Sequence, residues 1–547
     1  MKKIFMKPKE EFFNRFYLIG LVTLCCLNLA TFGIAMAIEH SGNISADETW
    51  MAVDNPHEIT GNVTVQNLIT LTLEPGVEVL FKGNYVIYVY GALVAQGTQS
   101  DQIRFTRATG VPAWSGLCLY QGSGGILDFC IIEWANQAIS ANSCYLTVSN
   151  CTIRNNTYGL YATTLNPYLA DNIFENNGTG MRLDNYYAPT VRDGLLADGG
   201  ENNVFRDNGT GIHFYDCMLP TVGGTAHIAD NTTYGVYFRD CASPGLSADI
   251  LTSGTGIYYQ NCTDISSLED VSLIANTGEF GAVRVQGSGP VRLGAGNTIA
   301  DNTYPLSIDA ASYATEDSIL PLAENHANGI RVDSGTSQQD AAWYDFGLPY
   351  MVTTSPTLGT SASLTVEPGV EVRLGSNTYI YNYGDLQVNG SDENGVIFTR
   401  DQAARWTYIR FLSGATGSLS YATVEFASYG LHVNTAAPEV DHCRLQNNTN
   451  GYYGEATATS YIHNCLIANN DYGVRSRSGS DPLINQNSIM QNYYYGVLQE
   501  DIDFTIDAEG NYWGDASGPR HVSNPGGRGD FVSDWVDFDP WLASDPL

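Results

Sequence analysis

The hydrophobic and polar positions of this chain follow one short pattern that returns three times between Asn202 and Tyr259. Each copy has apolar residues at alternate positions, a polar turn of Asn or Asp, a glycine, and then a second alternation. An alternation with a period of two predicts short β-strands. A unit of two or three such strands cannot bury its apolar face alone, so the copies must stack on one another as a solenoid.

A glycine after each polar turn sets the register of this repeat, and Gly180, for example, follows Gly159 by 21 residues. The glycine recurs at Gly159, Gly180, Gly211, Gly235, Gly256 and Gly281, and again at Gly430, Gly451, Gly473 and Gly496. The first and third positions after it are apolar and should point inward. The period suits one coil of strands, and the consensus of leucine-rich repeats is missing. The sequence therefore predicts an all-β fold, a single-stranded parallel β-helix.

The chain also repeats itself on a larger scale. L-T-L-E-P-G-V-E-V-L-F at 71–81 returns as L-T-V-E-P-G-V-E-V-R-L at 364–374, and Trp343 follows Trp50 at the same offset of 293 residues. This constant offset predicts an internal duplication. We expect a first β-helix copy at 39–311, a join at 312–342, a second copy at 343–509 and a C-terminal closing segment at 510–547.

The N-terminal segment, residues 1–38, predicts export. An uncharged apolar run from Phe16 to Ile38 follows a basic stretch and ends in Ala35-Met36-Ala37, a small-x-small cleavage pattern. These features are typical of a signal peptide, and the alternative is an uncleaved membrane anchor helix. The remainder of the chain should then be periplasmic, extracellular or on the cell surface, touching a membrane only through this segment.

The charge of the exported part narrows the class of partner. The whole chain has 25 basic and 58 acidic residues, and residues 1–38 account for five and two of them. The remaining 20 basic against 56 acidic residues leave a net charge of −36. Such a surface repels phosphate backbones and excludes nucleic acid as a partner, whereas cations and neutral ligands fit it.

Two motifs carry a resemblance to a known family. The coil N-x-x-G-I-x-F and the ending G-N-Y-W-G-D-A-S-G-P at 510–519 resemble the right-handed parallel β-helix repeat family, which includes pectate-lyase-like enzymes and NosD-type periplasmic proteins. The resemblance covers about residues 50–542 and implies a right-handed coil. It implies no single activity, because the family includes enzymes, binding proteins and structural proteins.

The best candidate for a ligand site is the outward column two residues after the repeat glycine. Its members are Tyr161, Arg182, His213, Tyr237 and Tyr258. We expect them to lie on one exposed face in successive rungs, where aromatic faces offer stacking surfaces for sugar rings. The competing interpretation is that the tyrosines are ordinary strand-forming residues.

Acidic, sulfur and amide side chains also recur at fixed positions. Asp216 and Asp240, five after the glycine, would bring like charges one rung apart and attract a cation such as calcium, unless they are solvated turn residues. Cys217, Cys241 and Cys262 would lie within reach of a cross-rung disulfide. The Asn and Asp pairs before each glycine should form stacked columns joined by their amides, and Asn177, Asn208 and Asn231 also begin N-x-T sequons.

Three further motifs are incomplete as active or binding sites. Asp54-Asn55-Pro56-His57 interrupts the Asp-Pro-His signature of β-helix uronate epimerases, and Arg528-Gly529-Asp530 lies inside the closing segment. Asp441-His442 has no second acid or arginine that the sequence pattern assigns to it. None of them is assigned a catalytic role.

The sequence thus favours a secreted or cell-surface binding or structural module that recognises glycan or another cell-surface component. The Asn-Thr-Asp and Gly-His-Gly patterns of polygalacturonases are absent, as is the Arg-x-Pro-x-x-Arg pattern of pectate lyases. The alternative is a polysaccharide-active enzyme, a lyase, hydrolase or epimerase, whose carboxylates come together across rungs.

Overall fold

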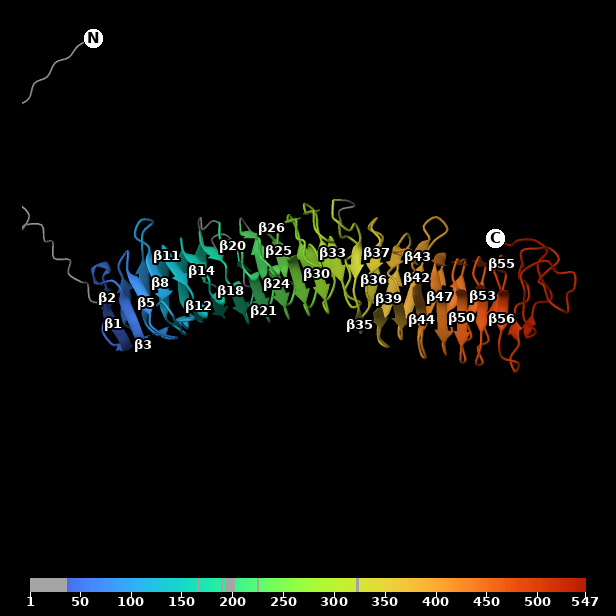
Figure 1. Cartoon of the computed structure of the whole chain (residues 1–547), viewed down its shortest axis with the longest axis horizontal. Coiled ribbons are helices and arrows are strands. Elements are labelled where there is room, and N and C mark those ends of the chain that lie inside the picture. The colour runs from blue at the N-terminus through green and yellow to red at the C-terminus, as the bar shows by residue number, and fades with distance from the viewer. Residues whose placement is uncertain (1–36, 165–166, 188–189, 192–201, 224–225, 321–323) are drawn as a thin grey trace, which may run out of the picture.

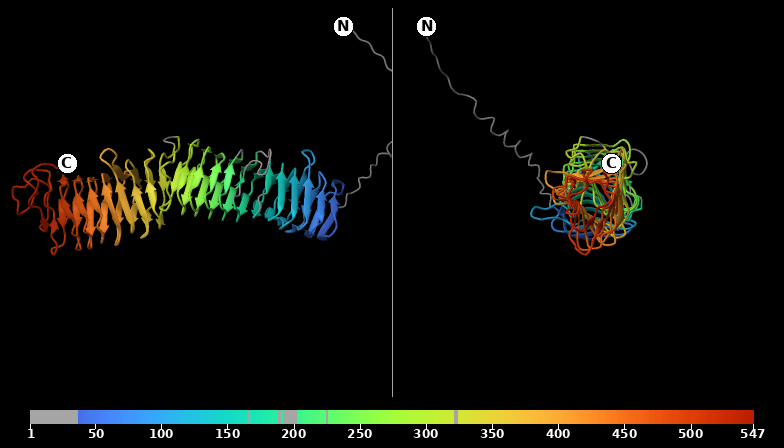
Figure 2. Two further views of the ribbon diagram at one scale, coloured as in Figure 1. Left: turned by 180° about the vertical axis from the view of Figure 1, so that it is seen from behind. Right: turned by 90° about the vertical axis from the view of Figure 1, so that its right-hand side faces the viewer.

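The protein is one elongated β-solenoid whose coils stack along a single axis from β1 (Ile38–Ile44) to the C-terminal segment (Figure 1). The computed structural model describes residues 37–164, 167–187, 190–191, 202–223, 226–320 and 324–547. Seen from one end, the coils lie over one another (Figure 2). The ladders between the named strands are parallel throughout, so the predicted parallel β-helix is confirmed.

Most coils contribute a strand to each of three faces. In the first half, the face that carries the predicted column contains β12 (Gln137–Asn142), β15 (Tyr158–Thr163), β18 (Thr179–Asp184), β21 (Thr210–Tyr215), β24 (Tyr234–Arg239), β27 (Thr255–Gln260), β30 (Val283–Gln286) and β33 (Leu306–Ile308). A second face contains β8 (Ile103–Arg107), β11 (Cys130–Glu133) and β14 (Thr152–Arg154). A third is a six-stranded sheet of β2 (Glu48–Trp50), β4 (Thr70–Leu73), β7 (Ala92–Gln96), β10 (Gly124–Asp128), β13 (Tyr145–Ser149) and β16 (Tyr168–Ala170).

The ladder of parallel strands continues across the predicted join. β33 pairs with β34 (Ile330–Val332), which pairs with β37 (Tyr350–Val352) and then β40 (Glu371–Leu374). The second half adds an eight-stranded sheet of β35 (Gly335–Ser337), β38 (Pro356–Leu358), β41 (Tyr379–Asn382), β44 (Trp406–Phe411), β47 (Ala427–Asn434), β50 (Asn450–Glu455), β53 (Tyr472–Ser476) and β56 (Tyr495–Gln499). Both halves therefore belong to one continuous solenoid.

The interior is filled by the apolar positions that the repeat predicts. Ile212, Phe214 and Val236 are fully buried, and the ring of Phe214 stacks on that of Phe238 one coil further on, with centroids 5.0 Å apart. This spacing is close to the distance between neighbouring strands, so identical positions on successive coils meet ring to ring. The core is a set of continuous ladders of like side chains.

The repeat glycine lies inside a strand, and this corrects its assignment to the turn. Gly180 and Gly211 are the second residues of β18 and β21. A Cβ atom on Gly180 would come within 2.6 Å of the carbonyl oxygen of Gly211 on the next coil. The glycine is needed because the coils approach closely there, and the left-handed turn falls on the preceding Asn or Asp, as at Asn176 with φ of 56°.

The asparagine columns are confirmed as buried ladders. The side-chain oxygen of Asn208 accepts the backbone N–H of Asn177 at 2.9 Å, and its amide donates to the carbonyl of Phe174 at 2.9 Å. Asn177, Asn208 and Asn231 are all buried. Their sequons are therefore inaccessible in the folded chain, because the amides that glycosylation would use are already bonded inside the solenoid.

The predicted cross-rung disulfide is absent from this structure. Cys217, Cys241 and Cys262 lie in one buried column, but each is a free thiol bonded to backbone carbonyls. Burial raises the pKa of the Cys144 thiol to about 11, so this side chain is a protonated core filler near neutral pH.

The signal peptide predicted for residues 1–38 lies outside the described residues, apart from Ala37 and Ile38. Among the described residues, no helix is long and apolar enough to cross a membrane.

Candidate functional site

The five predicted column residues do lie one above another. Tyr161 is in register with Arg182, Arg182 with His213, His213 with Tyr237 and Tyr237 with Tyr258, each on the next parallel strand. We call these five residues the outer strip. At about 4.8 Å per strand, it extends over roughly 19 Å.

The last three rings of the outer strip cover one another, so the expectation that their faces are exposed is wrong for His213, Tyr237 and Tyr258. His213 stacks on Tyr237 with ring centroids 4.4 Å apart, and Tyr237 stacks on Tyr258 at 5.0 Å. Only 9% of His213 and 8% of Tyr258 is exposed. The physical reason is that the strand spacing nearly equals the stacking distance of aromatic rings. Ring edges and hydroxyl groups remain available to a ligand. The hydroxyl group of Tyr237 donates to the side-chain oxygen of Gln260.

The N-terminal end of the strip is an internally neutralised charge pair. Arg182 donates to both oxygens of Asp184, at 2.8 and 3.0 Å, and the Tyr161 hydroxyl donates to the same carboxylate at 2.9 Å. The guanidinium also lies over the ring of Tyr215, 5.3 Å from its centroid. Burial and the neighbouring Asp184 raise the pKa of the Tyr161 hydroxyl. This group therefore acts as a hydrogen-bond donor near neutral pH.

His213 carries an unused polar atom in the middle of the strip. Its Nε2 is buried without a hydrogen-bond partner in the described part of the chain. Burial, followed by the positive charge of Arg182, lowers the pKa of His213 to about 4. The imidazole is therefore neutral at neutral pH, and it adds no positive charge to the strip.

The two metal candidates lie in turns. Asp216 and Asp240 have left-handed backbones, with φ of 51° and 54°. The carboxylate of Asp240 accepts from the amide of Asn261 at 3.1 Å and pairs with Arg239 at 3.4 Å. Within the residues that the structure describes, no three His, Cys, Asp or Glu side chains are grouped to hold a metal ion. Calcium binding by Asp216 and Asp240 stays a prediction.

Two of the incomplete motifs have structural roles. His57 is buried, lies 2.9 Å from a ring nitrogen of His40 and stacks on Trp50 at the N-terminal end of the solenoid. Asp530 accepts the amide of Asn492 at 2.7 Å and so ends an asparagine ladder. The Arg-Gly-Asp tripeptide is therefore not presented as an exposed loop, because its carboxylate is engaged in the cap.

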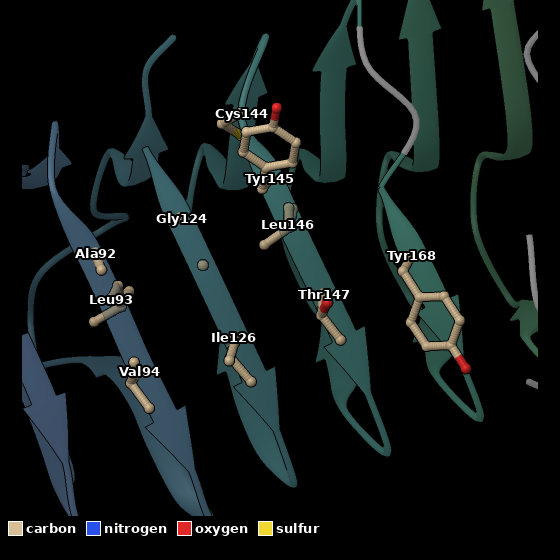
Figure 3. Close-up of a pocket in the computed structure, with 11 residues that line it drawn as sticks. Ala92, Leu93, Val94, Gly124, Ile126, Cys144, Tyr145, Leu146, Thr147 and Tyr168 are labelled. Atoms are coloured by element: carbon tan, nitrogen blue, oxygen red, sulfur yellow. The ribbon is translucent and has the colours of Figure 1, made fainter. Parts of the chain in front are cut away.

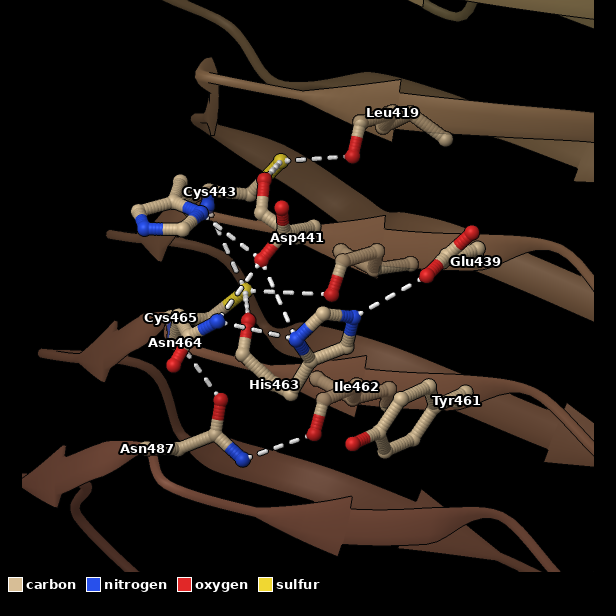
Figure 4. A network of polar contacts seen from close by, with 12 residues as sticks. Leu419, Glu439, Asp441, Cys443, Tyr461, Ile462, His463, Asn464, Cys465 and Asn487 are labelled. Carbon is tan, nitrogen blue, oxygen red and sulfur yellow. Dashed lines mark hydrogen bonds and ion pairs between the residues drawn. The ribbon is translucent and has the colours of Figure 1, made fainter. Parts of the chain in front are cut away.

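The third motif, Asp441-His442, has contacts in the structure that the sequence pattern did not predict. His463 lies one strand further on and contacts Asp441 through Nδ1 at 3.1 Å and Glu439 through Nε2 at 3.1 Å. Asp441 also contacts Nδ1 of His442 at 2.7 Å (Figure 4). Asn464, His442 and His463 lower the pKa of Asp441, whose burial acts in the opposite direction. The cluster places two carboxylates and two imidazoles on one surface.

A second strip of the same kind was missed on the eight-stranded sheet. Arg410, His432, Tyr453 and Arg475 are in register on β44, β47, β50 and β53. The signal was available, because His432, Tyr453 and Arg475 each lie two residues after a repeat glycine.

Glu455 organises this second strip. Its carboxylate accepts from Asn434 at 2.8 Å, contacts His432 and Arg410 at 3.0 Å each, and pairs with Arg477 at 3.1 Å. These hydrogen bonds and charges lower the pKa of Glu455 to about 2 against the opposing effect of burial. The strip therefore holds an ionised acid at its centre near neutral pH.

An apolar groove on the outer face of the six-stranded sheet was also missed. It is a hollow of about 460 Å³ across β7, β10, β13 and β16 (Figure 3). The side chains that define it are Ala92, Val94, Ile126, Tyr145, Thr147 and Tyr168, and Gly124 lies between them. None of its eleven lining residues is charged. The sequence signal was weak, because these positions lie in register on successive strands but carry no recurring type of residue.

Tyr145 differs from the tyrosines of the outer strip in having a free ring. It is 76% exposed and stacks on no other ring in the described part of the chain. Beside it, a Cβ atom on Gly124 would meet nothing within 4 Å. The groove therefore combines an open aromatic face with an unfilled floor.

The comparisons with known proteins identify the fold. The family described as "Right handed beta helix region" matches residues 90–238 and 403–506. No curated protein matches the chain. A solved structure of the PL6 family alginate lyase AlyGC, in a mutant form, is similar over 87% of this chain and 95% of that chain, with 10% identity and a TM-score of 0.20. A likeness this low carries no argument about activity. The family match over these two segments and the stacked parallel coils together support a right-handed β-helix repeat family for this chain.

Proposed function

We propose that this protein is an exported β-helix binding module that recognises a neutral glycan at a cell surface. The observation that carries the proposal is the uncharged groove beside the free ring of Tyr145. A pyranose has one apolar face and a rim of hydroxyl groups, and aromatic side chains bind such a face while polar neighbours bind the rim. In a chain of net charge −33, a neutral ligand avoids the electrostatic repulsion that an anionic polymer meets.

The backbone around the groove favours a sugar over an extended peptide. β10 is paired with β7 on one side and with β13 on the other, so its ladder groups are already bonded. A peptide therefore cannot pair with the strands at the centre of the groove, and the sheet edge lies at β16, which is paired with β13 on one side. A sugar needs only the ring of Tyr145 and the hydroxyl groups of Thr147 and Tyr168, all of which line the groove.

The outer strip is the second candidate contact for the same ligand. It consists of Tyr161, Arg182, His213, Tyr237 and Tyr258. Its tyrosines would act through their hydroxyl groups, and the stacked rings of His213, Tyr237 and Tyr258 through their edges, since the faces of these three are covered. A glycan that spans both surfaces must bend around the solenoid, because the strip and the groove lie on different faces. The groove is therefore the primary site in this proposal.

The test is binding of the purified protein to a glycan array, followed by calorimetry with the best neutral oligosaccharide. Tyr145→Ala should weaken binding by about five- to thirtyfold, because loss of an aromatic stacking contact costs about 1–2 kcal/mol. Gly124→Leu should abolish binding with the fold intact, because the added side chain enters the empty floor. Tyr493→Ala, at a tyrosine that is 74% exposed and remote from the groove, is the matched control.

The results distinguish the groove from the outer strip. Unchanged affinity in both groove variants would refute the groove as the site. If Tyr237→Ala and Tyr258→Ala weaken binding instead, the outer strip is the primary contact.

The enzyme alternative is favoured by one observation, the position of His463 between Glu439 and Asp441 (Figure 4). New reducing ends or unsaturated products from a polysaccharide panel with calcium would establish it, and their absence would leave the binding proposal.

A further inference from the structure

A second hollow, on another face from the groove, is lined by arginine side chains. It has a volume of about 470 Å³ and lies between β8, the loop after it and the ring of Trp134. Arg104, Thr106 and Arg107 line one wall, and Val111 and Pro112 come from the loop. Two guanidinium groups in one hollow are unexpected in a chain with 58 acidic and 25 basic residues.

Arg107 has no carboxylate partner among the described residues. Its guanidinium donates to the carbonyl oxygen of Pro112 and lies over the ring of Trp134, 4.1 Å from the ring centroid. Both contacts orient the side chain without neutralising it, because a carbonyl and an aromatic face carry no full charge. Arg107 is half-buried, so its charge faces the hollow with limited access to solvent.

The neighbouring acid is already engaged beneath the hollow. Glu133 is 2% exposed and is bonded by Arg104, by Arg154 at 2.9 Å and by the hydroxyl of Thr106 at 3.0 Å. Arg104 also lies 3.5 Å from Glu78. Three guanidinium groups thus face two carboxylates, which leaves one positive charge, and Glu133 holds Arg104 in a fixed orientation.

The equivalent place in the second half serves as an internal comparison. Arg400 likewise lies over an aromatic ring, that of Phe426, at 4.1 Å, and donates to the carbonyl of Ala403 at 2.7 Å. Ile397 and Gln446 stand 293 and 292 residues after Arg104 and Arg154. The second half therefore keeps the arginine over the ring and lacks the two other guanidinium groups.

We propose that the hollow of Arg104 and Arg107 binds a single oxyanion group, a carboxylate, sulfate or phosphate, carried by a small ligand or by one unit of a larger one. A guanidinium fork binds such a group in a bidentate manner, and Arg107 has donors free for it. The acidic remainder of the surface repels polyanions, so the site selects ligands with an isolated negative group. The site is independent of the neutral groove and is tested separately.

The experiment titrates the intact exported chain with sodium sulfate, sodium phosphate, sodium acetate and monomeric galacturonate, each against sodium chloride at equal ionic strength. Binding is read by calorimetry and by the fluorescence of Trp134, with Trp134→Phe identifying its signal. We expect at least one of the four anions to bind. Arg107→Ala should weaken that binding at least tenfold. Arg107→Lys keeps the positive charge and loses the bidentate guanidinium group, so it should weaken the binding less.

Arg400→Ala is the matched control, since it removes an arginine with the same ring contact from a place that lacks the other two guanidinium groups. The affinity of Arg400→Ala for the bound anion should stay within twofold of the affinity of the unmodified protein. The proposal is overturned if none of the four anions binds, or if Arg107→Ala and Arg400→Ala affect binding equally. Selective binding of galacturonate over free acetate would identify a sugar-borne carboxylate, whereas preference for sulfate or phosphate would identify those groups as the ligand.

Discussion

Replacement of Asn208 by alanine should strongly destabilise the middle of the solenoid. Asn208 is fully buried, and its amide connects three coils. Its oxygen accepts the backbone N–H of Asn177 at 2.9 Å, and its nitrogen donates to the carbonyl of Phe174 at 2.9 Å and to the side chain of Asn231 at 3.2 Å. Alanine removes all of these bonds and supplies no replacement.

The expected cost follows from the N–H of Asn177, which would remain buried without its acceptor. The carbonyl of Phe174 keeps its place in the ladder with Phe205 on the next strand and loses only its second donor. One unpaired buried group costs about 1–3 kcal/mol, so the free energy of unfolding should fall by about 2 kcal/mol. Asn142 is the control, because it is exposed and its amide contacts only the hydroxyl of Ser143, at 3.2 Å. Asn142→Ala should change stability by less than about 0.5 kcal/mol.

The assay is urea unfolding followed by circular dichroism and tryptophan fluorescence, combined with hydrogen exchange. A solenoid can open locally, so the two optical probes need not report the same transition. The N–H of Asn177 should lose its protection in Asn208→Ala and keep it in Asn142→Ala. Equal stability of the two variants, with Asn177 still protected, would show that the ladder contributes little.

Two further predictions concern titration and calcium. Burial lowers the pKa of His432 to about 4, below its ordinary 6.5, so the unfolded chain takes up this proton first as the pH falls. The free energy of unfolding should therefore fall by about 3 kcal/mol between about pH 6.5 and pH 4 because of this group. In melting curves, His432→Gln should reduce that loss. An unchanged pH dependence in this variant would contradict the burial argument. If Asp216 and Asp240 bind calcium, millimolar calcium should raise the Tm of the unmodified protein and not that of Asp240→Asn, a change that keeps the left-handed turn. An equal rise in both would assign calcium to another site.

The candidate sites differ in how far the sequence could reveal them. The outer strip was predictable as a column, because each member lies two residues after a repeat glycine and strands stack in register. The groove was not predictable, because it depends on the empty space around Tyr145 and Gly124, which the sequence does not show. The contact of Asp441 with His463 depends on a neighbouring strand, so the dipeptide Asp441-His442 alone looked incomplete.

The sequence by itself determined the solenoid, its inward residues and its asparagine ladders. These features repeat once per coil. Because the backbone of each coil has the same course, residues at the same position of successive coils lie above one another, whatever side chains surround them. The tertiary structure alone decided which rings are free, which charges are paired and which hollows stay empty. Tyr237 is covered by His213 and Tyr145 is open, although both are outward tyrosines on a strand. The physical reason is that exposure depends on side chains from adjacent coils and loops, whose packing the repeat pattern does not encode.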